Sequence, residues 1–103
     1  MDDRRHSPRR LADWRVEFGP PGALVRGFLA DLSPMGVSIL SETQYPVGTE
    51  IEVHFWLPEE YEAESFLIRA IVRHSTGRRI GAQFVDPEFP QRERLWKIMR
   101  GVP

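Results

Sequence analysis

The chain has 103 residues, of which 41% are hydrophobic, and it contains no cysteine. A chain of this length forms one compact domain with a modest core, and without cysteine it has neither a disulfide framework nor a thiolate for catalysis or metal binding. The formal net charge of −1 excludes a molecule-wide positive field for a long polyanion, and no apolar run approaches the roughly twenty residues of a membrane-spanning helix.

The N-terminal residues are basic and show no apolar periodicity. Arg5 and Arg9 stand there in an RxxxR spacing, and Arg4 precedes them. This composition predicts a flexible basic arm over residues 1–12, followed by a globular part over residues 13–103. The arm also lacks the apolar core of a secretory signal. Together with the absence of cysteine, this leads us to expect a cytoplasmic protein.

From residue 14 onward the chain reads as short strands separated by turn residues. The clearest strand covers residues 50–57, where Ile51, Val53 and Phe55 recur at the period of two that places them on one face. Several short strands at close spacing predict an all-β barrel or sandwich. The expected strands cover residues 14–18, 24–31, 37–40, 50–57, 66–75 and 80–84.

The pattern changes to a helical one near the C-terminus. Leu95, Ile98 and Met99 recur at helical spacing. Pro90 suits the first turn of a helix, and Gly101 lies where a helix would end. We therefore expect a single C-terminal helix whose apolar stripe closes one end or side of the barrel.

The run from Asp31 to Gly36 is the most informative part of the chain. It reads Asp-Leu-Ser-Pro-Met-Gly, and the positions of its proline and glycine predict a type I β-turn between two strands. In a purely structural interpretation, Asp31 and Ser33 cap backbone N–H groups and Gly36 tolerates a positive φ. In a functional interpretation, the carboxylate, the hydroxyl and the glycine form part of a site for an anionic guanine nucleotide.

Two further features favour the functional interpretation. An RxxxR pair at Arg5 and Arg9 followed by a DxSxxG run, in this order, resembles the PilZ domain family. The stretch 80–84 reads Ile-Gly-Ala-Gln-Phe. Its glycine with a phenylalanine later in the same strand is similar to a strand near the end of PilZ domains. The RxxxR spacing is not specific by itself, since Arg69 and Arg73 repeat it.

The resemblance extends over nearly the whole chain, and every residue of the family's binding pattern is present. It implies a six-stranded antiparallel β-barrel with a C-terminal helix, acting as a bacterial receptor for cyclic di-GMP. The implied ligand-binding residues are Arg4, Arg5, Arg9, Asp31, Ser33 and Gly36. We expect a receptor that changes conformation on binding and acts through a downstream protein, with no catalysis and no cofactor.

The residue types suit this ligand chemically. An arginine fork matches the O6 and N7 acceptors of guanine and the oxygens of a phosphodiester, and it also stacks on a purine. Asp31 offers acceptors to the N–H groups on the other edge of guanine, and Gly36 lets backbone approach the ligand. In PilZ domains an arginine just before the RxxxR pair is associated with a stacked, intercalated ligand dimer. Arg4 holds that position, so the resemblance implies two ligands per chain.

Other functions remain open at this point. One is a protein-interaction module of the same fold that needs no ligand. Another is a small-barrel RNA-binding module, disfavoured by the near-zero net charge and by the lack of an aromatic stacking platform on the expected strands. His6, His54 and His74 are not at metal-ligand spacing. Ser33 has no recognisable base for nucleophilic catalysis, so neither a metal site nor an enzyme is expected.

Overall fold

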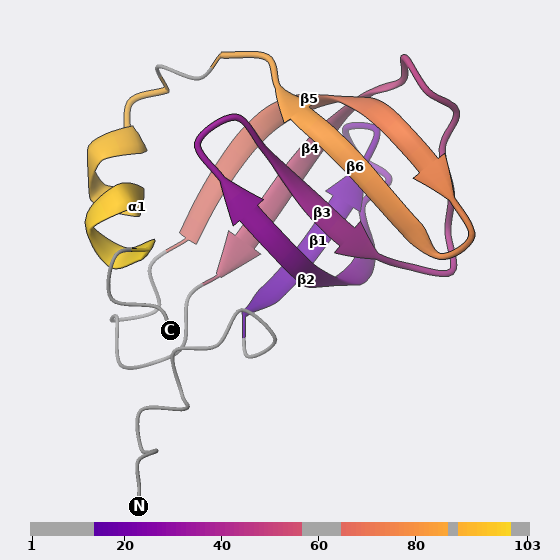
Figure 1. Ribbon diagram of the computed structural model, residues 1–103, viewed down its shortest axis with the longest axis horizontal. Coiled ribbons are helices and arrows are strands. Elements are labelled where there is room, and N and C mark those ends of the chain that lie inside the picture. Colours follow the sequence, from indigo (N-terminus) through magenta and orange to yellow (C-terminus); the bar gives the residue numbers. More distant parts are fainter. Residues whose placement is uncertain (1–13, 57–64, 87–88, 100–103) are drawn as a thin grey trace, which may run out of the picture.

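The computed structural model describes residues 14–56, 65–86 and 89–99. They form six antiparallel strands and one helix, with the strands closed into a barrel in the order β1-β2-β3-β6-β5-β4 (Figure 1). The elements are β1 (Arg15–Gly19), β2 (Val25–Ser33), β3 (Gly36–Leu40), β4 (Glu50–Trp56), β5 (Ser65–Thr76), β6 (Arg79–Phe84) and α1 (Arg92–Met99). The expected six-stranded antiparallel barrel with a C-terminal helix is confirmed, and closure of the sheet excludes the sandwich.

The alternation expected from the sequence builds the interior of the barrel. Ile51, Val53 and Phe55 of β4 are buried, and so are the matching positions of β5. The rings of Phe55 and Phe66 pack against each other with centroids 5.6 Å apart. Because adjacent side chains on a strand point to opposite faces, the same alternation places the intervening side chains on the outside. Most of these are polar or charged, but Phe28, Leu40 and Leu67 are exposed apolar ones.

The helix α1 lies beside the barrel (Figure 1), and its Leu95 side chain packs into the core. Leu95 is only 1% exposed and belongs to the same core cluster as the strand residues. The N-terminal end of α1 joins the chain just after Phe89, which packs edge-on against Phe84 with ring centroids 5.8 Å apart. Leu95 of the expected apolar stripe therefore attaches the helix to the barrel core, whereas the side chains of Ile98 and Met99 lie outside those described.

Two β-bulges interrupt the regular pairing, and neither is expected from the sequence. In β2 the register with β3 shifts between Leu29 and Asp31. In β5 the register with β6 shifts between Val72 and His74. A bulge inserts one extra residue on one strand, so it changes which face the following side chains occupy. Both bulges lie in strands that border the candidate site.

Candidate functional site

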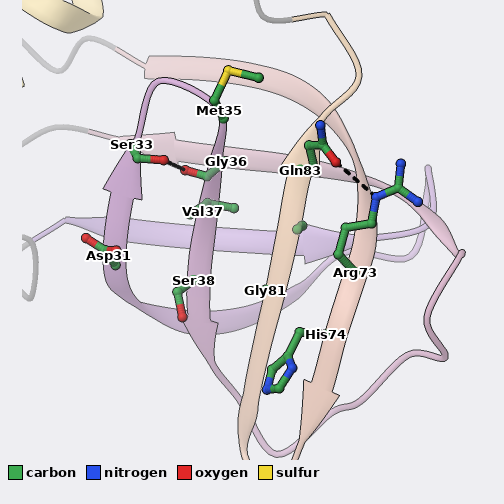
Figure 2. A pocket seen from close by; sticks show the side chains of 11 residues that line it. Asp31, Ser33, Met35, Gly36, Val37, Ser38, Arg73, His74, Gly81 and Gln83 are labelled. Carbon is green, nitrogen blue, oxygen red and sulfur yellow. Dashed lines mark hydrogen bonds between the residues drawn. The ribbon is translucent and has the colours of Figure 1, made fainter.

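A shallow depression on the outer surface of the barrel brings the DxSxxG residues together. It is formed by β2, β3, β5 and β6 and has a volume of about 310 Å³. Its lining residues, several of them drawn in Figure 2, are Asp31, Ser33, Met35, Gly36, Val37, Ser38, Arg73, His74, Gly81, Ala82 and Gln83. We call it the hairpin depression, because the turn between β2 and β3 forms one end of it.

The β2 bulge determines where the Asp31 carboxylate lies. Leu29 pairs with Ile39 and both are buried, whereas Asp31 pairs with Ser38 and is exposed. With strict alternation from Leu29, the side chain of Asp31 would point into the apolar barrel, where a carboxylate without a partner is costly. Because Ala30 is the extra residue, Asp31 points outward and Leu32 returns to the core.

The turn expected over residues 33–36 is confirmed as a tight hairpin. Ser33 pairs with Gly36 across it, so only Pro34 and Met35 form the loop. The Oγ of Ser33 donates a hydrogen bond to the carbonyl oxygen of Gly36 at 3.4 Å. The loop is held against β6, since the backbone N–H of Phe84 donates to the carbonyl of Met35 at 2.8 Å. The Ser33 hydroxyl is thus positioned on a braced turn.

Gly36 serves close strand packing and not a left-handed turn. The expectation that it tolerates a positive φ is wrong, because it is not among the described glycines with positive φ. A Cβ at this position would instead collide with the carbonyl oxygen of Ala82 on β6. The glycine lets β3 and β6 lie close together and leaves the bottom of the depression bare.

The far side of the depression is built by residues that the sequence reasoning did not select. Figure 2 shows Arg73 and Gln83 joined there by a hydrogen bond from Nε to Oε1, which is 3.0 Å long. The β5 bulge exposes Arg73 and His74 side by side. Gly81 pairs with His74 on one side and with Ser38 on the other. A glycine therefore lies between the Arg73 side of the depression and its Asp31 side.

The two arginines of the second RxxxR spacing, Arg69 and Arg73, thus have different surroundings. Arg69 is held on the outer face of β5 by Glu50, whose carboxylate accepts from its Nε at 2.9 Å. This hydrogen bond, together with the charge of Glu50, raises the pKa of Arg69 above its ordinary value. Arg73 instead donates to the neutral amide of Gln83, and no carboxylate among the residues described pairs with its charge. Only the strand order β3-β6-β5 reveals that Arg73 lies in the same depression as Ser33.

The other expected site residues, Arg4, Arg5 and Arg9, lie outside the described residues, as does the predicted arm over residues 1–12. Within the described part of the chain, no group of three or more histidine or acidic side chains is arranged to hold a metal ion. No helix among those residues is long and apolar enough to cross a membrane.

Comparison with known proteins identifies the class. The family model of the PilZ domain matches residues 3–101 of the chain. The chain therefore belongs to the PilZ domain family. None of the curated proteins matches it.

Proposed function

We propose that this PilZ domain is a receptor for cyclic di-GMP and has no catalytic activity of its own. The observation that carries the proposal is the hairpin depression. There Asp31 and Ser33 lie on one side and Arg73 on the other, separated by a floor of small residues (Figure 2). Membership of the PilZ family supports the same ligand, since these domains generally bind it.

The chemistry of the depression fits a guanine base and its phosphodiester. Asp31 presents acceptors for the N–H groups of guanine, and the Ser33 hydroxyl can accept or donate a hydrogen bond. Gly36 and Gly81 have no side chain to keep a planar purine away from the strands. The guanidinium of Arg73 matches the phosphate oxygens or the O6 and N7 acceptors of the base.

The basic arm completes the proposed site. In this proposal Arg5 and Arg9 bind the ligand from the side opposite the barrel, and the arm over residues 1–12 gains order at that moment. Arg4 stacks on, or hydrogen-bonds to, a second ligand molecule, so that an intercalated dimer binds at saturation. Closure of the arm changes the surface of the molecule, and a downstream protein reads this change in the cytoplasm.

Isothermal titration with cyclic di-GMP tests the proposal. We expect saturable binding with two ligands per chain, and no binding of GMP at the same concentration. Arg9→Ala, Asp31→Ala and Arg73→Ala each remove a charge-assisted contact, typically worth about 1.5–3 kcal/mol, so each weakens binding roughly tenfold to a hundredfold.

Two exposed residues provide matched controls for these variants. Arg69→Ala removes an arginine that is paired with Glu50 outside the depression, and Glu93→Ala removes a carboxylate on α1. Both should bind like the parent. Absence of binding by the parent would indicate a ligand-independent interaction module, and a ratio of one ligand per chain would contradict the role of Arg4.

A further inference from the structure

A second depression lies at the opposite end of β2 and β3 from the hairpin. It has a volume of about 290 Å³. Its lining combines apolar, basic and hydroxyl side chains and consists of Arg26, Gly27, Phe28, Leu40, Ser41, Glu42, Thr43 and Arg78. None of these residues lines the hairpin depression. The proposed cyclic di-GMP site therefore leaves this surface without a role.

The centre of this surface is an exposed apolar pair. Phe28 and Leu40 face each other across β2 and β3, and they are 64% and 39% exposed. Arg15 of β1 and Arg79 of β6 continue the same cross-strand row on its two sides. A large aromatic ring left in water at the middle of a sheet is a typical anchor for a protein partner.

The charges around the apolar pair are predominantly positive and only partly compensated. Arg78 is paired with Glu42 at 3.1 Å, and Arg15 with Glu17 at 3.2 Å. Arg26 is exposed and forms no ion pair within the described residues. Arg79 donates a hydrogen bond to the Ser38 hydroxyl at 2.8 Å, and no carboxylate in the described part of the chain pairs with it. A complementary partner therefore carries carboxylates.

The closed barrel restricts how such a partner can bind. A sheet with an open edge can take up a peptide as an additional strand, but every strand of this barrel is paired on both sides. Recognition at this surface must therefore act through side chains, with an apolar anchor between Phe28 and Leu40. The exposed apolar pair suits a peptide, which can supply a large apolar side chain beside its carboxylates, better than a nucleic-acid backbone, which has no such group.

From these observations we propose that the outer face formed by Arg26, Phe28, Leu40 and Arg79 is a docking surface for a protein partner. The partner contributes an acidic segment with one large apolar side chain. Its apolar side chain covers Phe28 and Leu40, and its carboxylates bind Arg26 and Arg79. Peptide binding at this surface is measured without cyclic di-GMP, so its test stands apart from that of the ligand site.

Selection from a random peptide library displayed on phage tests this proposal. The library is selected on the parent protein after depletion on Phe28→Ser, and enriched peptides are synthesised for fluorescence anisotropy. We expect enriched sequences that combine an aromatic or large aliphatic residue with Asp or Glu. Their affinity should fall about tenfold or more in Phe28→Ser and in Arg26→Glu, and it should fall steeply with added salt.

Two control variants and tests for other binding partners make the experiment decisive. Leu67→Ser removes another exposed apolar side chain, on β5, and Lys97→Glu reverses an exposed charge on α1, so neither should alter peptide affinity. Failure to enrich peptides that depend on Phe28 would overturn the proposal. It would also be overturned if Phe28→Ser abolished self-association in sedimentation, or binding of a single-stranded oligonucleotide, in place of peptide binding.

Discussion

At the scale of single residues, Gly36 shows how one position serves the barrel and the site together. Its missing side chain lets β3 approach the Ala82 carbonyl of β6, and the same gap leaves the floor of the hairpin depression bare. A glycine read from sequence alone suggests a turn with positive φ. Here the requirement is steric, and it comes from a strand more than forty residues further along the chain.

Gly36→Ala should therefore destabilise the fold. The added Cβ would meet backbone atoms of β6, which cannot rotate away as a flexible side chain could. Overpacking of this kind costs about 1–3 kcal/mol, measurable by urea unfolding. Gly81→Ala is the control, because its Cβ would meet only the Cβ of His74 at 3.4 Å, an ordinary contact. Equal stability of the two variants would show that β3 and β6 have room to separate.

At the scale of elements, the helix depends on the barrel more than on its own sequence. The α1 segment has eight residues, and isolated helices of that length do not persist in water. Leu95 supplies its buried contact with the core cluster. The stability of the helix and that of the barrel are therefore linked through this side chain.

Leu95→Ala tests that link. Truncating a fully buried leucine costs about 2–5 kcal/mol through lost burial and the remaining cavity. We expect a lower unfolding midpoint in urea, together with faster amide exchange throughout α1. Lys97→Ala, on the exposed side of the same helix, should stay within about 0.5 kcal/mol of the parent. A parent-like midpoint for Leu95→Ala would mean that α1 contributes little to the core.

The elements also show what the sequence can and cannot predict. The strands and the helix follow from period-two and helical spacing, because those periods are local properties of the chain. The hairpin at residues 33–36 follows from its proline and glycine. The two bulges do not, since the extra residues Ala30 and Arg73 are defined only by pairing with other strands. The RxxxR spacing of Arg69 and Arg73 likewise gives no sign of a site, although the structure places Arg73 in the depression that contains Asp31.

At the scale of the whole molecule, two surfaces share β2 and β3, and one hydrogen bond connects them. Ser38 lines the hairpin depression, and Arg79 borders the proposed docking surface through its register with Leu40. The Arg79 guanidinium donates to the Ser38 hydroxyl at 2.8 Å. This hydrogen bond links the proposed ligand site to the proposed docking surface.

Cyclic di-GMP and an acidic docking peptide should therefore weaken each other's binding. Both are anions, and both draw on the single positive charge of Arg79, which the ligand attracts toward Ser38 and the peptide attracts toward Leu40. Coupling free energies of this kind are typically about 1–3 kcal/mol, or roughly 5- to 150-fold in affinity. The factor must be the same in either direction, because binding equilibria are reciprocal.

Titration of each molecule into protein saturated with the other measures this coupling. Arg79→Ala should bring the coupling factor close to one, whereas Arg26→Ala should weaken the peptide and leave the factor unchanged, since Arg26 lies away from Ser38 and lines only the second depression. Equal peptide affinity with and without cyclic di-GMP would show that the two surfaces act independently. Stronger peptide binding in the presence of the ligand would mean that ordering of the arm, and not competition for Arg79, transmits the signal.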